Sequence, residues 1–338
     1  MLGQIIGIDL GTSSVVVFSK ERGIILEEPS VVAYEEHTGD IIAAGKEAEA
    51  IFGREPVGVI AEKPLRNGVI YNYDIAREML KIFLKRSLKG QFLRSTIVAC
   101  VPSNSTEIER RAVRDAAKGT GAKKVYILEE PMAAAIGAGL PVDEPFGSAI
   151  FDMGGGTSDF AVISLGGVVT SESINIAGNA FDSEIIKYVK KKYNIHIGQK
   201  SAEKLKIEIG GIYKAPLENL TMKVGGRDAI DGLPKTVEIS TYDICEALEE
   251  CGEEILKCIN RVLEITPPEM SGDIRCNGIT LSGGSSLIRG LDSLIKDRLD
   301  INVHYAPDPT RCVAYGTGYY HDFILKNKDL LSGIEELI

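Results

Sequence analysis

The chain has 338 residues, of which 44% are hydrophobic and 25% charged, and its formal net charge is −10 at pH 7. This length favours two domains, and the composition is typical of a soluble globular protein. The negative charge argues against nucleic acid as a partner, because phosphate backbones require a basic surface. No apolar run reaches the roughly 18 residues of a membrane span, and the N-terminus lacks the basic region of a signal peptide, so we expect a cytoplasmic protein.

Residues 4–18 predict a β-hairpin, in which an apolar run ends in Asp9 and a second apolar run follows a turn of small residues. The turn contains Gly11, Thr12, Ser13 and Ser14. Such a turn gathers backbone N–H groups into an anion nest, and glycine allows a phosphate to approach the backbone closely. A carboxylate beside it repels phosphate but can hold Mg²⁺ through water, and Mg²⁺ bridges phosphates.

Residues 23–45 contain strand-like runs with a turn at Gly39-Asp40, and we assign them to a first small subdomain. Residues 77–94 hold six basic residues and one acid, an exception in an acidic chain. We expect an amphipathic helix here whose core face is formed by Ile75, Met79, Ile82, Phe83 and Leu88. Phe92 and Leu93 follow Gly90 in a predicted exposed turn before the strand at 96–103.

The next segments predict a helix after each of two strands. The strand at 96–103 precedes a helix with a capping box formed by Thr106 and Glu109. The segment 124–140 predicts a strand and then a helix that begins at Pro131. Glu130 is then the N-cap residue, where the helix dipole favours an ionised carboxylate.

Residues 149–163 repeat the pattern of the first hairpin, about one domain's length further along the chain. Asp152 ends the apolar run, and the turn contains Gly154, Gly155, Gly156, Thr157 and Ser158. Either turn alone favours an ordinary tight turn. The matched pair instead indicates two similarly built domains that clamp a Mg²⁺-bound polyphosphate between them.

The C-terminal part adds a strand, a Gly283-Gly284 turn and a helix at 277–291, a geometry that suits close approach of a phosphate or ribose. Small residues at 312–320 predict a late helix that makes a close crossing between domains. The six cysteines show no C-x-x-C pair, and the four histidines form no metal-binding set, so we expect reduced, mostly buried thiols.

Together these blocks resemble the actin, heat-shock-chaperone and sugar-kinase ATPase superfamily, and within it the MreB family of bacterial actin-like cell-shape proteins. The similar segments include "EEPSVVAY", "EKPLRNGVI", "VPSNSTEIERRAVRDAAKGTGAKKVYILEEPMAAAIGAG", "DMGGGTSDFAVISLGGVVTS", "KKKYNIHIG", "AEKLKIEIG", "GLPKTVEIS" and "TPPEM". The resemblance runs from Ile5 to about Tyr320, nearly the whole chain. One block alone is weak, but the ordered set is specific.

The resemblance implies an actin-like (ribonuclease H-like) α/β fold, with two domains around a nucleotide cleft and a smaller subdomain inserted in each. The first domain is expected at 1–142 plus 318–338, with its small subdomain at about 32–64. The second is expected at 143–317, with its small subdomain at about 182–245. Rigid-body movement of such halves couples nucleotide state to the cleft angle.

The resemblance also implies roles for individual residues. Asp9 and Asp152 are the expected Mg²⁺ residues, acting through water, and Glu130 is expected to orient the attacking water with help from Thr157. The expected ATP-binding residues are Gly11, Thr12, Ser13, Gly154, Gly155, Gly156, Thr157, Glu203, Lys206, Gly283, Gly284 and Ser285. Glu203 and Lys206, three residues apart, fall on one helix face, where the alternative to a shared ligand is an exposed ion pair.

Two segments depart from the family pattern. The first turn usually reads G-T-A-N-T, where this chain has Gly11-Thr12-Ser13-Ser14-Val15, and we expect the loss of a polar group at Val15 to affect phosphate contact or turnover. After Thr157 the family usually has Thr-Glu, where this chain has Ser158-Asp159. The expected catalytic positions are kept.

The implied function is an ATP-hydrolysing cytoskeletal protein that forms paired homopolymeric filaments on the inner face of the cell membrane. The resemblance implies that the filament guides cell-wall synthesis, or that it determines shape and movement in a wall-less cell. It also implies cell-shape membrane proteins as further partners. In the family, the turn that holds Phe92 and Leu93 is a membrane-inserting loop, and its basic flanks suit anionic lipid.

Two other classes in the superfamily remain as alternatives. A small-molecule kinase needs a sugar pocket and an aspartate base, whereas the residue expected beside the γ-phosphate here is Glu130, which suits water. A chaperone-type ATPase normally carries a separate substrate domain, and about eighteen residues follow Tyr320 here. A polymerising ATPase is therefore the favoured interpretation.

Overall fold

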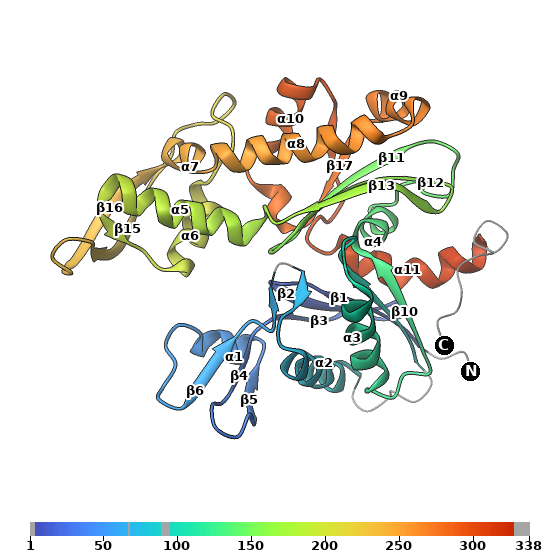
Figure 1. Cartoon of the computed structure of the whole chain (residues 1–338), viewed down its shortest axis with the longest axis horizontal. Coiled ribbons are helices and arrows are strands. Elements are labelled where there is room, and N and C mark those ends of the chain that lie inside the picture. Colours follow the sequence, from blue (N-terminus) through green and yellow to red (C-terminus); the bar gives the residue numbers. More distant parts are fainter. Residues whose placement is uncertain (1–3, 67, 89–94, 328–338) are drawn as a thin grey trace.

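The computed structural model describes residues 4–66, 68–88 and 95–327. Within these ranges the chain forms two five-stranded sheets, two three-stranded sheets and a two-stranded pair, with helices packed on them (Figure 1). The mixed architecture agrees with the predicted α/β class.

The first large sheet begins with the predicted hairpin. In spatial order its strands are β10 (Lys124–Glu129), β9 (Thr96–Val101), β1 (Ile5–Leu10), β2 (Ser14–Ser19) and β3 (Gly23–Pro29). The β1–β2 and β2–β3 pairs are antiparallel, whereas β1, β9 and β10 run parallel. The apolar residues of this sheet pack against α2 (Tyr73–Leu88) and α3 (Glu107–Lys118). The capping box predicted for α3 is present, with Thr106 and Glu109 as its members.

The predicted core face of α2 is confirmed, because Ile75, Met79, Phe83 and Leu88 are buried and Ile82 is partly buried. The helix therefore uses its apolar side to cover the first sheet. Phe92 and Leu93, the two residues expected to insert into a membrane, lie outside the described residues.

The second large sheet contains the second predicted hairpin. Its spatial order is β13 (Gly167–Ile174), β12 (Ser158–Ser164), β11 (Ser148–Met153), β17 (Ile279–Ser282) and β18 (Val303–Tyr305). As in the first sheet, the hairpin strands pair antiparallel, here β11 with β12 and β12 with β13. Strand β17 runs parallel to β11, and β18 runs parallel to β17. The same half of the chain contains α8 (Glu249–Ile265), α9 (Pro268–Asn277) and α10 (Leu291–Leu299). The short 3-10 turn η1 (Gly284–Leu287) follows β17.

Two helices, α4 (Glu130–Gly137) and α11 (Cys312–Lys326), share one apolar cluster with both large sheets. They cross very closely, because a Cβ atom added at Gly316 would lie 1.7 Å from the carbonyl oxygen of Ala133. One added at Gly137 would lie 1.9 Å from the carbonyl oxygen of Cys312. The close approach predicted from the small residues at 312–320 is confirmed, and its position between two domains stays a prediction.

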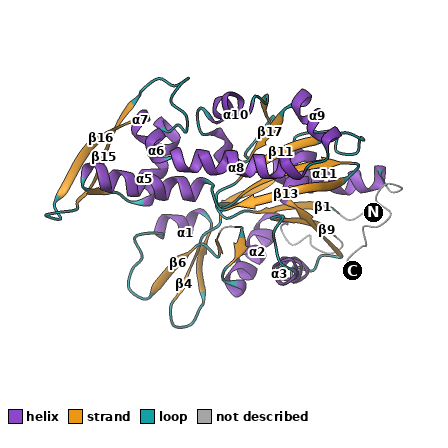
Figure 2. Ribbon diagram, turned by 45° about the horizontal axis from the view of Figure 1, so that its top comes forward, coloured by secondary structure: helices purple, strands orange, loops and turns teal. Residues whose placement is uncertain are grey.

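Two small sheets lie at the same end of the molecule, at the left in both ribbon views (Figures 1 and 2). One consists of β4 (Val32–Glu35), β5 (Ile41–Ala44) and β6 (Val59–Glu62), with α1 (Lys46–Ile51) beside it. The other consists of β14 (Ile195–His196), β15 (Thr221–Asp228) and β16 (Pro234–Ser240), with α5 (Gly178–Tyr193), α6 (Gln199–Ile209) and α7 (Thr241–Ala247). The two-stranded pair is β7 (Leu65–Arg66) with β8 (Val69–Ile70).

The assignment of all of residues 23–45 to the first small subdomain needs a correction. Residues 23–29 form β3, which pairs with β2 in the large sheet, and only β4 and β5 belong to the small one. Strand β3 extends the hairpin of β1 and β2 into a three-stranded meander before the chain leaves the sheet. The two small units also touch each other, since the ammonium of Lys200 donates a hydrogen bond to the carbonyl oxygen of Glu49 at 3.2 Å.

Candidate functional site

The two glycine-rich turns face a common cavity of about 510 Å³. It is lined by Asp9 and residues 11–14 of the first hairpin and by Asp152 and residues 154–157 of the second. Glu130, Glu203, Lys206 and the loop at 283–285 complete its wall. The structure therefore brings together every predicted catalytic, nucleotide-binding and Mg²⁺ residue, although they come from both halves of the chain.

The first turn is held by one hydrogen bond within the turn and by two from outside the hairpin. The N–H of Gly11 donates to the carbonyl of Ser14 at 3.1 Å, and the hydroxyl of Ser30 donates to the carbonyl of Gly11 at 2.6 Å. The N–H of Gly68, between β7 and β8, donates to the hydroxyl of Thr12 at 2.8 Å. Ser30 and Gly68 are supports that the sequence did not identify.

Val15 does not lie where we expected it, since its departure from the family pattern led us to expect a position in contact with phosphate. Its side chain is fully buried and belongs to the core cluster under the first sheet. Val15 pairs with Leu10 in β1 and does not line the cavity, whereas Ser14 does. The loss of a polar group at Val15 therefore removes no contact from the cavity wall.

The second turn requires glycine at Gly155, the middle one of its three glycines. A Cβ atom added at Gly155 would lie 1.8 Å from the hydroxyl oxygen of Ser13, so the two turns touch each other through this glycine. The carbonyl of Gly154 accepts a hydrogen bond from the hydroxyl of Ser285 at 2.6 Å, and the carbonyl of Gly155 accepts one from the N–H of Asn179 at 2.8 Å. A side chain is therefore excluded at Gly155, whereas a Cβ at Gly154 would lie 3.4 Å from the carbonyl oxygen of Thr157, which is an ordinary contact.

Four acidic side chains gather near the two turns, and three of them, Asp9, Glu130 and Asp152, line the cavity. Glu130, Asp152 and Asp159 are buried, and Asp9 is partly buried. Asp152 and Asp159 stand opposite each other on β11 and β12. Burial raises the pKa of Asp9 and of Asp152 to about 7, and neighbouring acids add to the effect at Asp152. Burial followed by repulsion from Asp159, Asp9 and Asp152 raises the pKa of Glu130 well above its usual range.

This group of acids fits a divalent cation. Like charges in a desolvated site are costly unless a counter-ion is present, and hard cations such as Mg²⁺ prefer oxygen ligands. The Oδ1 atom of Asp152 is buried and has no hydrogen-bond partner, which leaves it available to a cation or to cation-bound water. Within the described ranges, no group of three or more His, Cys, Asp or Glu side chains is close enough to hold a metal by itself. Water and phosphate oxygens would therefore complete the coordination.

Glu130 lines the cavity at the start of α4, one position later in the helix than the sequence indicated. Glu129 is the N-cap residue, Glu130 is the first helical residue and Pro131 the second. The Arg110 guanidinium bonds the Glu129 carboxylate at 2.8 Å, which anchors the helix start. The predicted helix start at Pro131 is therefore wrong by one residue, although Glu130 still experiences the positive end of the helix dipole.

The other end of the cavity is formed by α6 and by the loop after β17. Glu203 and Lys206 both line it, but they do not form the ion pair that was the alternative reading of their spacing. The ammonium of Lys206 instead lies 2.7 Å from the carboxylate of Asp182 and donates to the carbonyl of Gly178 at 3.0 Å. Gly283 has φ of +80°, and a Cβ there would lie 2.2 Å from the carbonyl oxygen of Met153, so only glycine fits.

The sequence reasoning missed several cavity residues, among them the polar residues Asn179, Asp182 and Arg289. None belongs to a glycine-rich turn or to a local motif. Their neighbours in space are distant in the sequence, so spacing within one helix or hairpin gave no signal.

The cysteines behave as the sequence suggested, because all six are free thiols and five of them are buried, with Cys276 exposed. Cys100 lies behind the site, with its sulfur 3.6 Å from the Oδ1 atom of Asp9. Among the described residues, no helix has both the length and the apolar character needed to cross a membrane.

Two sheets that each open on a glycine-turn hairpin, with small subdomains at one end and a cavity between the turns, define an actin-like protein. The family model described as MreB/Mbl protein matches residues 3–329. The chain belongs to the MreB/Mbl family.

Solved structures and curated relatives agree with this assignment. The chain is 42% identical to the cell shape-determining protein Mbl of Bacillus cereus over 98% of each chain. It is also 42% identical to the cell shape-determining protein MreB of Escherichia coli, over 94% of this chain and 93% of the relative. The crystal structure of MreB 5 of Spiroplasma citri bound to AMPPNP superposes with a TM-score of 0.91 at 39% identity, covering 97% of this chain and 99% of that one. The predicted resemblance and the actin-like fold class are confirmed.

Proposed function

We propose that this chain binds ATP with Mg²⁺ in the cavity, hydrolyses the ATP, and couples hydrolysis to the assembly of homopolymeric filaments that determine cell shape. The cavity carries the proposal, because two glycine turns from separate sheets and the acids Asp9, Glu130 and Asp152 converge on it. Two structures of Spiroplasma citri MreB5, one bound to AMPPNP and one to ADP, support nucleotide binding at this fold.

The two turns are proposed to cradle the phosphates with their backbone N–H groups and with the hydroxyls of Thr12, Ser13 and Thr157. Asp9 and Asp152 would hold Mg²⁺ through water, and the cation would neutralise charge that develops on the phosphates. The unpartnered Oδ1 atom of Asp152 supports this role. At the other end, Glu203, Lys206 and residues 283–285 would bind the ribose and base.

Glu130 and Thr157 are proposed to orient the attacking water. Glu130 projects into the cavity from the start of a rigid helix, and Thr157 is a buried residue at the end of the second turn. The carboxylate of Glu130 accepts a hydrogen bond from the water and directs its lone pair toward the γ-phosphate. This arrangement favours hydrolysis over transfer to a sugar.

The domain division at 1–142 plus 318–338 and 143–317 remains part of the proposal, with small subdomains at about 32–64 and 182–245. The packing of α11 against α4 and against the first sheet supports this division, because it places a late helix of the chain beside the sheet formed by the first residues. The contact between Lys200 and Glu49 spans the two small subdomains, so opening the cleft would break it. Filament neighbours would sense such a movement.

Assembly of the purified chain tests the proposed function. With ATP and Mg²⁺ we expect light scattering to rise and electron micrographs to show paired filaments, together with release of phosphate. A coupled assay with a panel of sugars is the control for kinase activity. Sugar phosphorylation without any polymer would contradict the cytoskeletal proposal and favour the kinase.

Membrane attachment through Phe92 and Leu93 is the second part of the proposal, and it places the filament on the inner face of the membrane. Burying the two side chains in lipid is worth roughly 1.5–3 kcal/mol each, and the flanking bases add about 1 kcal/mol each near anionic lipid. One monomer would bind weakly, but a filament presents many copies. Cell-shape membrane proteins are further proposed partners.

The double variant Phe92→Ser with Leu93→Ser is expected to abolish co-sedimentation with anionic vesicles while sparing the ATPase rate. Co-sedimentation at two salt concentrations separates the apolar part of the binding from the ionic part, because salt screens only the latter. Retained binding of the double variant would exclude this loop and direct attention to the apolar C-terminal "LLSGIEELI".

A further inference from the structure

Arg289 follows the loop at 283–288 and joins it to the end of α6. Its guanidinium donates to the carbonyl of Gly210 at 2.7 Å and also to the carbonyl of Ile209. A third hydrogen bond, of 3.3 Å, reaches the hydroxyl of Thr241 at the start of α7. The last carbonyls of a helix lack partners within it, and a cation there is favoured by the helix dipole. Arg289 therefore caps the C-terminus of α6.

The backbone strengthens this junction. The carbonyl of Arg289 accepts a hydrogen bond from the N–H of Ile212 at 3.0 Å, so the loop and the segment after α6 bind each other in both directions. Gly210 also packs tightly on the last turn of the helix, since a Cβ there would lie 2.1 Å from the carbonyl oxygen of Lys206. The capped end is thus one helical turn from Lys206.

Both elements that Arg289 joins form the wall of the cavity. Helix α6 presents Glu203 and Lys206, and the loop presents residues 283–285. A shift of α6 relative to the loop would change the width of this end of the cavity while leaving the two glycine turns in place.

We propose that Arg289 is a positioning residue that sets the separation between α6 and the loop at 283–288, and so determines the affinity for the nucleoside part of the nucleotide. This inference rests on the proposed binding of ATP. Arginine is required because its planar fork reaches two carbonyls and a hydroxyl together, which the single ammonium of a lysine at the same position does not.

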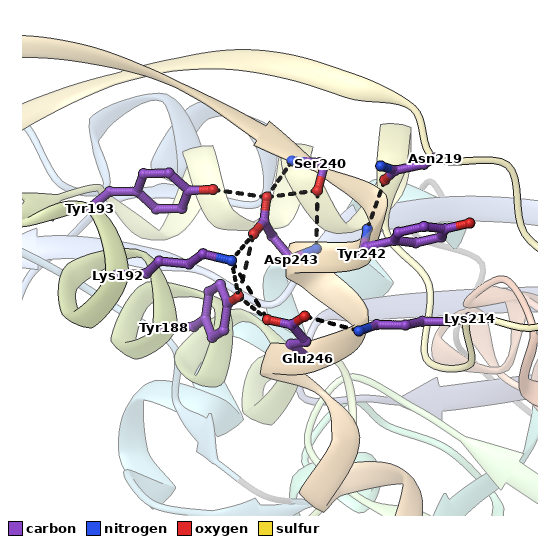
Figure 3. Close-up of polar contacts among 9 residues, drawn as sticks. All are labelled: Tyr188, Lys192, Tyr193, Lys214, Asn219, Ser240, Tyr242, Asp243 and Glu246. Atoms are coloured by element: carbon purple, nitrogen blue, oxygen red, sulfur yellow. Dashed lines mark hydrogen bonds and ion pairs between the residues drawn. The ribbon is translucent and has the colours of Figure 1, made fainter.

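A neighbouring network offers a matched control. Figure 3 shows Asp243 of α7 accepting hydrogen bonds from Lys192 at 2.6 Å, from Tyr193 at 2.9 Å and from the N–H of Ser240 at 2.8 Å. The network ties α5 to α7, the same helix that Arg289 contacts. None of its nine residues, all within the described part of the chain, lines the cavity. Asp243→Asn therefore loosens the same subdomain while removing neither of the hydrogen bonds that Arg289 donates to the carbonyls at the end of α6.

The test compares the parent, Arg289→Lys and Asp243→Asn by calorimetry with two probes, ATP with Mg²⁺ and inorganic tripolyphosphate with Mg²⁺, and by thermal unfolding. We expect Arg289→Lys to weaken ATP binding on the order of tenfold, the scale of one lost charge-assisted hydrogen bond, and to leave tripolyphosphate binding within about twofold. Asp243→Asn is expected to lower the unfolding temperature while binding both probes as the parent does. Tripolyphosphate binding also reports that each variant is folded.

Equal ATP affinity in Arg289→Lys and the parent would overturn the positioning role while leaving ATP binding intact. Equal losses for both probes would also overturn it, because the effect would then extend to the phosphate turns. The same selective loss of ATP affinity in Asp243→Asn would also overturn the positioning role, because the effect would then come from general loosening of the subdomain. A parent that binds tripolyphosphate but not ATP would overturn the proposed function itself.

Discussion

Replacing Glu130 by alanine is expected to slow phosphate release by on the order of 100-fold or more and to leave ATP affinity nearly unchanged. The carboxylate lies in the cavity at the start of α4, where it can orient a water but is not part of either phosphate turn. Its removal also takes one acid from a crowded group of acids, so binding of the anionic nucleotide has no reason to weaken. Single-turnover phosphate release and equilibrium ATP binding measure the two effects separately.

Glu129→Ala is the matched control for this prediction. Glu129 is the adjacent residue and pairs with Arg110 outside the cavity, so its loss affects the helix start but not the proposed water position. We expect a small loss of stability and a turnover close to that of the parent. Hydrolysis at the parent rate by Glu130→Ala, or an equal loss in both variants, would show that Glu130 does not orient the water.

The two hairpins were predictable from sequence because their signals are local. An apolar run, an acid and a run of small residues specify a strand and a tight turn wherever they occur, and the register of both pairs follows from them. The capping box at Thr106 was predictable for the same reason. At Glu130 the local signal was ambiguous by one residue, because proline is tolerated at either of the first two helical positions.

The remaining parts of the site depend on contacts between distant segments. Spacing placed Glu203 and Lys206 on one helix face and left an exposed ion pair as the alternative to a shared ligand. The fold instead supplies Asp182 from α5 as the partner of Lys206. Similarly, the strand register sends Val15 into the core and leaves Ser14 at the cavity. Arg289 has no local motif at all, since its acceptors are the end of a helix almost eighty residues earlier.

The second large effect is expected at Asp152, where one substitution changes stability and ligand response in opposite directions. In the ligand-free protein, burial raises the pKa of Asp152 to about 7 from its usual value near 4. A carboxyl whose pKa is raised by folding contributes most to the stability of the folded protein below its unfolded-state pKa. This contribution to stability is lost as the pH rises through the folded-state pKa of about 7. At pH 8 the folded protein therefore carries a buried charge that costs stability.

Asp152→Asn removes that charge and nearly keeps the shape of the side chain. We expect the ligand-free variant to unfold several degrees higher than the parent at pH 8, and the difference to shrink toward pH 5, where the parent carboxyl is protonated. Addition of ATP with Mg²⁺ is expected to stabilise the parent strongly and the variant weakly, with Mg²⁺-dependent ATP affinity reduced on the order of 10- to 100-fold. Thermal unfolding at pH 5 and pH 8, each with and without ATP and Mg²⁺, measures the stability of both proteins and their response to the ligand.

Asp115→Asn, on the exposed side of α3, is the control and should match the parent throughout. An Asp152→Asn variant that keeps the full Mg²⁺ response would remove this residue from the cation site, because an amide does not replace the charge that draws the hydrated cation into the cleft.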